Sequence, residues 1–427
     1  MKHLKKYIKK LLPLWLLEFV YSIIVRIDFI ISRFQHKNTV KKLQNKETIN
    51  VVFFVLFESV WKVDYLYRFM VLDKRFNPTI LICPVVNKGN QYMIEQMNSC
   101  YNYFYNLGYN VIKSYDLDTD RYIDVRHTIS PDVIFYTNPY QSLIDSRYYI
   151  DKFKDILTCY VPYYYGEGVQ GEFVNHKLHN ECWKFFVESD FHYSFCKRHM
   201  YNNAKNVLVT GYPGVDAFLD DNYIPNDVWK IKNKKIKRLI WAPHHSINES
   251  ASLSYSCFLY YYQYMLDVAR HYKNEIQVAF KPHPLLKNNL YSYWGKDKTD
   301  EYYNKWANGE NTFLVEGNYV DLFLTSDAMI HDSGSFLIEY LYVNKPVMRT
   351  DNNRPLEQQF NDFAIECLKY YYHAHDTNDI SNFVMLLINE EDPLKEKRTK
   401  FCNEVLNKNE TIPSVKIYTY LKSIFKN

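Results

Sequence analysis

The chain has 427 residues, which is too long for one small domain and suits two or three. Hydrophobic residues make up 47% and charged residues 23%, so a sizeable core is available and global disorder is not expected. The net charge of +4 is carried by residues 1–46, where eleven Lys or Arg accompany two acids, and this local basicity argues against a general nucleic-acid binder.

Residues 1–46 form the first predicted segment. Five lysines occupy the first ten residues, and the apolar stretch that follows is interrupted by Glu18, Arg26 and Asp28. Each of these charges is costly at the centre of a bilayer, so an amphipathic helix in the membrane plane is favoured over a spanning helix. Its lysines would meet anionic headgroups while apolar side chains enter the interface: Leu14, Trp15, Leu17, Phe19 and Tyr21. A helix packed on the protein's own core is the alternative.

The eight cysteines are scattered and include no CxxC pair. This pattern predicts buried free thiols in a reducing compartment rather than a disulfide framework or a zinc module. The early apolar stretch lacks a small-residue cleavage site, so no cleavable signal peptide is expected. These features favour a protein on the cytoplasmic side of a membrane.

Two stretches of alternating strand-like and helix-like sequence follow, at residues 47–225 and 226–392. Apolar runs such as "INVVFFVLF", "PDVIFYT", "RLIWAP" and "IQVAFKPHP" are separated by helical stretches, and a polar, basic linker lies at 220–238. Buried strands joined by helices are typical of parallel sheets, so we predict an α/β fold with two Rossmann-like domains facing a cleft. Residues 393–427 are helical and charged, and we expect them to pack back across the domains.

The residues after each predicted strand carry the most functional information, because ligands bind beyond the carboxyl ends of parallel strands. In "HDSGS", Asp332, Ser333, Gly334 and Ser335 follow a strand and begin a helix. The unpaired N–H groups of this helix, the small glycine and two hydroxyls would seat a phosphate or diphosphate. Ordinary N-capping by serine is the alternative. Glu339, one turn further, would accept hydrogen bonds from ribose hydroxyls or face solvent.

Basic residues follow two further predicted strands. Lys281 and His283, in "KPHP", are two residues apart and project the same way if the strand persists. A fixed cation beside an imidazole suits a diphosphate whose charge shifts in the transition state. His244, His245 and Ser246, in "WAPHHS", would enter the same site, although adjacent histidines point to different sides. Structural histidines satisfied within the core are the alternative.

The first domain contributes a loop of Tyr165, Gly166, Glu167 and Gly168. Its glycines allow a close approach to a substrate, and Glu167 is a candidate general base. The sequence contains no Walker P-loop and no GxGxxG motif. The segment "DLDTD" at 116–120 only partly matches a calcium loop and is expected to be an exposed acidic loop. A metal-binding pair at His244 and His245 is an alternative, but it lacks a nearby carboxylate ligand in the sequence.

Four motifs, "GYPGVD", "WAPHHS", "KPHP" and "HDSGSFLIEYLYVNKPV", resemble in order and spacing those of the CDP-glycerol glycerophosphotransferase family, which comprises teichoic-acid polymerase and primase-like enzymes. The resemblance covers roughly Thr158 to Thr350. It implies a GT-B-type fold and peripheral attachment to the cytoplasmic face of the membrane. It also implies transfer of an alditol phosphate from a CDP-activated donor to a hydroxyl of a lipid-linked or polysaccharide acceptor, without a required metal or cofactor.

Several site residues follow from the resemblance. His283 matches the family's catalytic histidine, and Ser333 and Ser335 match positions at the donor diphosphate. Lys281 takes the place of a basic or polar residue beside that histidine, and Glu339 replaces a residue that is often Asp. The resemblance therefore implies that the second domain binds the donor.

The chain departs from the family pattern in the first-domain loop, where the polymerases read like "HGTP" and the histidine is the expected base. Tyr165 stands at that histidine's position, which leaves Glu167 as the substitute base alongside His283. Two alternatives stay open. One is a GT-B glycosyltransferase that uses a nucleotide sugar, and the other is an inactive relative that acts as a scaffold.

Overall fold

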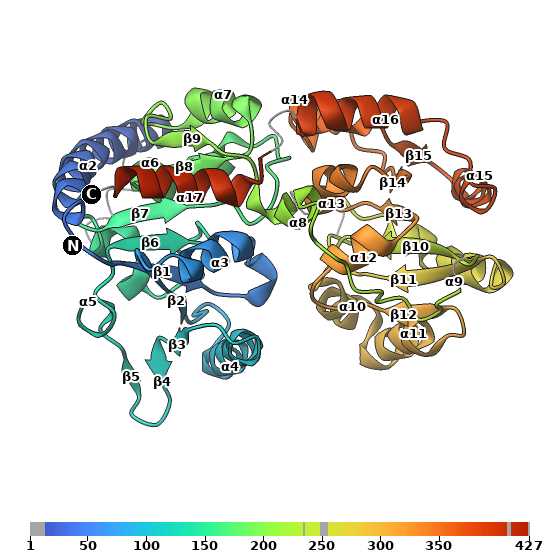
Figure 1. Cartoon of the computed structure of the whole chain (residues 1–427). Coiled ribbons are helices and arrows are strands. Elements are labelled where there is room, and N and C mark those ends of the chain that lie inside the picture. Colours follow the sequence, from blue (N-terminus) through green and yellow to red (C-terminus); the bar gives the residue numbers. More distant parts are fainter. Residues whose placement is uncertain (1–12, 234, 248–254, 408–410, 426–427) are drawn as a thin grey trace. The chain divides into compact units, whose positions relative to one another are not determined.

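The computed structural model describes residues 13–233, 235–247, 255–407 and 411–425, and the chain divides into two compact units (Figure 1). Unit 1 comprises Met1–Gly166, Gln170–Asp216 and Thr411–Asn427, and unit 2 comprises Glu167–Val169 and Ala217–Glu410. The boundary between the units lies near residue 216, whereas the sequence predicted it after residue 225. Residues 393–427 were predicted to form one segment, but those up to Glu410 belong to unit 2 and those from Thr411 onward belong to unit 1. Each unit has its own parallel sheet.

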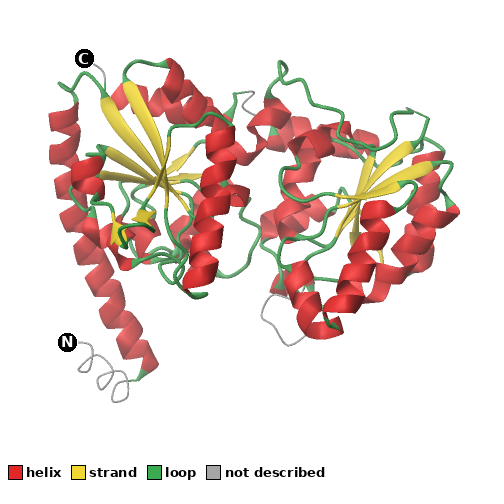
Figure 2. Ribbon diagram, turned by 90° about the horizontal axis from the view of Figure 1, so that it is seen from below, coloured by secondary structure: helices red, strands yellow, loops and turns green. Residues whose placement is uncertain are grey.

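The sheet of unit 1 has seven parallel strands in the order β3-β2-β1-β6-β7-β8-β9. The inner strands are almost entirely buried, as expected for continuous apolar runs covered by helices on both faces (Figure 2), whereas the edge strands β3 and β9 are partly exposed. Their bounds are β1 Ile49–Val55, β2 Phe76–Ile82, β3 Val111–Lys113, β6 Val133–Tyr136, β7 Leu157–Tyr160, β8 Lys184–Val187 and β9 Val207–Val209.

The helices of unit 1 include one from each end of the chain. Their bounds are α2 Leu14–Leu43, α3 Asp64–Leu72, α4 Asn90–Asn106, α5 Val125–Thr128, α6 Lys177–Glu181, α7 Asp190–His199 and α17 Pro413–Ile424. The last helix joins the same core as the sheet, because Ile417, Leu421 and Phe425 are buried there. Gly211, with a φ of 90°, lets Pro413 approach closely, since a Cβ at this glycine would lie 2.7 Å from the proline ring.

The long helix α2 carries apolar side chains on two faces. Its buried face, formed by Val25, Phe29, Ser32, His36 and Leu43, repeats at helical spacing and packs against α6 and β7. Its outward face is also apolar, and Figure 2 shows its first turns extending beyond the body of unit 1. The large exposed residues on that face are Trp15, Phe19, Val20, Tyr21, Ile23, Ile24, Ile27, Ile30, Ile31 and Phe34.

Two charges that interrupt the apolar stretch of α2 attach the helix to unit 1. Arg26 donates a hydrogen bond to the carbonyl of Tyr201 (3.1 Å), and Asp28 pairs with Lys154 (2.8 Å). The lysines expected at headgroups lie outside the described residues. None of the described helices is long and apolar enough to cross a membrane.

A small antiparallel hairpin projects from unit 1 (Figure 1). It consists of β4 (Tyr115–Asp116) and β5 (Arg121–Tyr122), and "DLDTD" forms its exposed turn. All eight cysteines are free and buried, as the sequence predicted.

Unit 2 contains a six-stranded sheet in the order β12-β11-β10-β13-β14-β15, again fully parallel. The strands are β10 Lys237–Ala242, β11 Ile276–Phe280, β12 Thr312–Leu314, β13 Ala328–His331, β14 Val347–Thr350 and β15 Tyr372–Ala374. The helices are α9 Phe258–His271, α10 Leu286–Trp294, α11 Lys296–Asn308, α12 Val320–Thr325, α13 Gly334–Glu339, α14 Asp362–Leu368, α15 Thr377–Ile388 and α16 Lys395–Phe401. The short α8 (Asp216–Leu219) lies where unit 1 ends and unit 2 begins.

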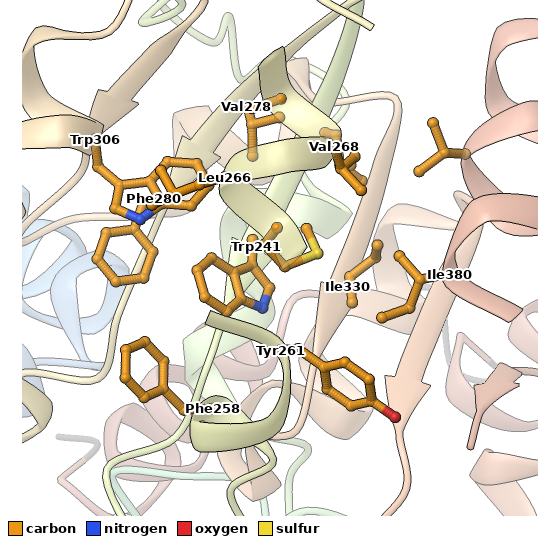
Figure 3. Packing of buried hydrophobic residues seen from close by; sticks show 14 of the residues in the cluster. Trp241, Phe258, Tyr261, Leu266, Val268, Val278, Phe280, Trp306, Ile330 and Ile380 are labelled. Carbon is orange, nitrogen blue, oxygen red and sulfur yellow. The ribbon is translucent and has the colours of Figure 1, made fainter. Parts of the chain in front are cut away.

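An aromatic stack forms the centre of the unit 2 core (Figure 3). Trp241 of β10 packs on Phe280 of β11 with ring centroids 5.1 Å apart, and Phe280 packs on Trp306 of α11 at 5.0 Å. Phe258, at the start of α9, stacks on the other side of Trp241 at 5.7 Å. This packing fixes β10 and β11 immediately before the loops that carry the candidate site.

Candidate functional site

The candidate site residues of unit 2 follow three neighbouring strands. β10 lies between β11 and β13, and the strands are in register so that Trp241 is beside Phe280 and Ala242 is beside His331. The segments 243–246, 281–283 and 332–335 therefore leave the same edge of the sheet. The grouping that the sequence predicted for the second domain is present.

Asp332 holds two of these segments together. One of its carboxylate oxygens accepts a hydrogen bond from the backbone N–H of His244, and the other accepts one from the N–H of Cys257 (2.6 Å). The side chain is almost fully buried, and this burial raises the pKa of Asp332 to about 7. Both oxygens thus accept hydrogen bonds within the protein, and Asp332 fixes the turn after β10 and the start of α9.

Ser246 likewise stabilises the turn after β10 through hydrogen bonds within the protein. Its hydroxyl lies 2.8 Å from Nδ1 of His244 and also accepts hydrogen bonds from the N–H groups of Tyr255 (2.8 Å) and Ser256 (3.3 Å). These bonds fix the ring of His244, which is buried, and burial holds its pKa well below the usual range.

Three histidine rings meet beside this turn. The ring centroids of His244 and His245 are 4.2 Å apart, and His283 lies 5.0 Å from the first and 4.3 Å from the second. Lys281, which is buried, lies close enough for its charge to lower the pKa of His283, although burial of that histidine is the larger cause of a pKa of about 3. The backbone N–H of Leu285 donates to Nδ1 of His283 (3.1 Å).

The three histidines are also the arrangement from which a metal site would be built. One ring nitrogen of each lies within 4.8 Å of a ring nitrogen of each of the others. Imidazole groups are common ligands of zinc and related metals.

The turn after β13 begins α13 without a side-chain cap. Ser333 occupies the N-cap position with an extended backbone, but its hydroxyl makes no capping hydrogen bond. The simple N-capping alternative is therefore not what this serine does. His331, two residues before Ser333 and fully buried, accepts the N–H of Ser333 at Nδ1 (3.1 Å) and contacts the hydroxyl of Tyr371 at Nε2 (3.2 Å). These contacts of His331 hold the turn between β13 and α13 in place.

Glu167 lies directly over the first turn of α13. A Cβ placed on Gly334 would be 2.5 Å from Oε1 of Glu167, so the missing side chain of the glycine makes room for the carboxylate. The carbonyl of Glu167 accepts the N–H of Asn361 (2.8 Å), and Gly168 forms an antiparallel bridge with Phe360. The sequence placed Glu167 and Gly168 in the first domain, but the structure packs them on unit 2, beside the predicted donor residues.

Tyr165 and Gly166 belong to unit 1. The ring of Tyr165 is buried between His192 and Tyr212, with centroid distances of 5.4 Å to each. Gly166 donates its N–H to Oε1 of Glu188 (3.0 Å), and its carbonyl lies 2.8 Å from Nε2 of His192. The ring of Tyr165 thus packs within unit 1.

The remaining predicted residues have different surroundings. Ser335, in the first turn of α13, is half-buried. Glu339 is buried, and the hydroxyl of Tyr319 donates a hydrogen bond to it. The alternative in which this glutamate faces solvent is therefore wrong.

Sequence reasoning missed the residues beneath the site. Arg349, at the end of β14, is buried and pairs with Asp351, which in turn contacts Nδ1 of His373 (2.6 Å). The positive charge of Arg349 acts to lower the pKa values of Asp332 and His331. The sequence signal is a charged residue inside the strand-like run "KPVMRT", which predicts a strand but no partner for Arg349.

Part of the chain matches a known family. Residues 167–421 match the family described as CDP-Glycerol:Poly(glycerophosphate) glycerophosphotransferase. Two Staphylococcus aureus proteins named teichoic acid ribitol-phosphate polymerase, TarL and TarK, are 26% and 24% identical over 185 residues. The alignment covers 42% of this chain and 30% and 33% of theirs, so the chain spans about a third of the length of these curated relatives.

Solved structures with a similar fold include epimerases of nucleotide sugars. The complex of Staphylococcus aureus MnaA with UDP has a TM-score of 0.53 and 13% identity, and covers 88% of this chain and 96% of that one. A crystal structure of UDP-N-acetylglucosamine 2-epimerase has a TM-score of 0.52 and 12% identity, with the same coverage. At this identity the similarity concerns the fold alone, and the fold is of the expected GT-B type.

Proposed function

Because the chain belongs to the CDP-glycerol:poly(glycerophosphate) glycerophosphotransferase family, we propose that it transfers an alditol phosphate from a CDP-activated donor to a hydroxyl of a lipid-linked or polysaccharide acceptor in cell-surface polymer synthesis. The observation that carries this proposal is the grouping of Lys281, His283 and the turn after β13 at one sheet edge, within the matched segment. A cation, imidazole rings and a serine-bearing turn are suited to a diphosphate.

In the proposed reaction, the oxygen of the acceptor hydroxyl attacks the β-phosphorus of the donor in line. The bond between the β-phosphorus and the oxygen that bridges the two phosphates breaks, and CMP leaves with that oxygen. The acceptor proton passes to Glu167 or His283. Lys281 and the histidines stabilise the negative charge that develops on the phosphates.

The test is to incubate the full-length protein with CDP-glycerol, CDP-ribitol and nucleotide sugars and to measure nucleotide release. We expect CMP release from a CDP-alditol, and we expect His283→Ala to abolish it in a folded protein. His271→Ala, an exposed histidine at the end of α9, is the matched control and should retain activity. Full activity in His283→Ala would refute the assignment. Release of nucleotide from nucleotide sugars alone would favour the glycosyltransferase alternative.

We further propose that α2 attaches the protein to the cytoplasmic face of an anionic membrane. Two of its outward side chains, Trp15 and Phe34, are 67% and 68% exposed, and the apolar face extends between them. A row of large exposed apolar residues next to five lysines at 1–10 suits a lipid surface, where both contribute to binding.

Vesicle sedimentation tests the attachment. The full-length protein should bind vesicles that contain phosphatidylglycerol more strongly than neutral vesicles, and Phe19→Glu with Ile23→Glu should weaken binding. Both side chains face outward, so these changes leave the buried face of α2 intact. Val71→Glu, another exposed apolar residue of unit 1, is the control. Equal binding of all three proteins would contradict the proposal.

A further inference from the structure

Two side chains of unit 1 hold the glycine that precedes Glu167. Oε1 of Glu188 accepts the N–H of Gly166 (3.0 Å), and the carbonyl of Gly166 lies 2.8 Å from Nε2 of His192. A carbonyl oxygen can only accept, so the hydrogen of this second bond lies on Nε2. Both backbone groups of one loop residue are therefore bound by ionisable side chains.

These two side chains come from one turn of the chain. Glu188 directly follows β8, and His192 lies in the first turn of α7. Ser189, between them, occupies the N-cap position of α7 but makes no capping hydrogen bond. Its hydroxyl instead lies 2.7 Å from Nδ1 of His192, which fixes the orientation of the ring. Glu188 and His192 are both buried, so the turn presents them to the loop in one arrangement.

The absence of a side chain at Gly166 permits this close approach. A Cβ placed there would lie 3.1 Å from Cδ2 of His192 and 3.3 Å from Oε1 of Glu188, which is tighter than ordinary contact. The ring of Tyr165 also packs on His192, with centroids 5.4 Å apart. The loop that leaves β7 is thus held at residues 165 and 166, immediately before Glu167.

Glu167 itself is fixed by unit 2. Its carbonyl accepts the N–H of Asn361 (2.8 Å), and its carboxylate lies over Gly334. A residue that is held at its own carbonyl and at the preceding peptide has little freedom to move its carboxylate. A catalytic group needs such support, because a displacement of about 1 Å costs about 10²-fold in rate.

The hydrogen bonds to Gly166 would also satisfy a buried loop residue that has no part in a reaction. Burying a carboxylate and an imidazole is costly, however, and backbone partners would satisfy a glycine at a lower cost. The two side chains also lie at the carboxyl end of β8, the edge at which parallel α/β sheets bind ligands. The residue that they hold is bonded directly to the candidate base, which favours a role in the reaction.

We propose that Glu188 and His192 are positioning residues, which hold Glu167 through Gly166 so that its carboxylate takes the proton of the acceptor hydroxyl. The inference rests on the proposed phosphotransfer and makes it more specific, because the proton passes to Glu167 and not to His283. Glu188 and His192 each act through a hydrogen bond to the backbone and not through a charge on the reacting atoms.

Paired variants of the full-length protein separate a positioning residue from a base. Glu188→Gln keeps an oxygen that accepts the N–H of Gly166, and His192→Gln keeps an N–H for its carbonyl, whereas Leu at either position removes the group. The Leu variants should lose about 10²-fold in kcat for CMP release with an unchanged KM for the CDP donor, because the proposed donor residues lie in unit 2. Each Gln variant should recover at least tenfold of that loss.

Asp190→Leu, which changes an exposed acid of the same turn, is the matched control and should retain activity. Thermal melting identifies the folded variants, and an Ala variant takes the place of any Leu variant that does not fold. Equal losses in Glu188→Gln and Glu188→Leu would show that the carboxylate of Glu188 is itself required, which would overturn the proposal.

A double-mutant cycle and amide hydrogen exchange complete the test. In the Glu167→Ala background, Glu188→Leu should cause no further loss of activity, because it acts through Glu167, and a further loss would contradict the proposal. Exchange of residues 161–170, followed by mass spectrometry, should be faster in Glu188→Leu than in the wild type. Faster exchange with wild-type turnover would overturn this inference alone, whereas a wild-type protein that turns over no CDP donor would refute the proposed function.

Discussion

The contact between Gly334 and Glu167 gives a sharp prediction for Gly334→Ala. The glycine begins α13 and is not among the glycines with positive φ, so alanine fits its backbone and should add up to about 1 kcal/mol of helix stability. The new Cβ would lie 2.5 Å from Oε1 of Glu167, whereas ordinary contact begins near 3.4 Å. The flexible carboxylate must therefore retreat by about 1 Å.

A displacement of this size in a catalytic group costs about 10²-fold in rate, or about 2.7 kcal/mol. We therefore expect Gly334→Ala to melt no lower than the wild type and to lose about 10²-fold in kcat for CMP release. In a double-mutant cycle, Glu167→Ala and Glu167→Ala with Gly334→Ala should have the same activity, because the alanine acts only through the carboxylate. Wild-type turnover in Gly334→Ala would refute the reasoning.

Three further changes test the interior of unit 2. The folded state holds a proton on Asp332 up to about pH 7, whereas the carboxyl of the unfolded chain loses it near pH 3.8. Rising pH across this window should therefore lower the free energy of unfolding by about 4 kcal/mol. In urea unfolding Asp332→Asn should remove this pH dependence, and an unchanged dependence on pH would contradict the assignment. Trp306→Ala should cost about 3–5 kcal/mol, measured in the same way, because the stacked ring is fully buried; a loss below 1 kcal/mol would contradict this packing. Arg349→Met should cost about 3 kcal/mol, because the buried Asp351 would lose the guanidinium and keep its contact with His373. Arg349→Met with Asp351→Asn should recover part of that loss, and no recovery would argue against the pair.

Much of the architecture was predictable because local sequence carries it. Parallel strands with helices on both faces must be apolar along their whole length, and runs such as "INVVFFV" and "IQVAF" have that form. The positions of His244, Lys281 and Asp332 at one edge followed from the rule that parallel strands share their carboxyl ends. These expectations needed no knowledge of contacts between distant segments.

Other features depended on residues far apart in the chain. The sequence indicated neither that Glu167 would lie over Gly334 nor that Tyr165 would be buried against His192, because each depends on partners from other elements. In the sequence, the charges of Arg26 and Asp28 predict only an obstacle to membrane insertion, whereas the structure pairs them within unit 1.

The sequence by itself determined the two parallel α/β sheets and the family, since apolar periodicity and short motifs are local properties. Only the tertiary structure decided that Glu167, which the sequence assigned to the first domain, packs over Gly334 at the start of α13. Glu167 and Gly334 lie far apart in the chain and meet only through folding, so no local pattern could predict their contact.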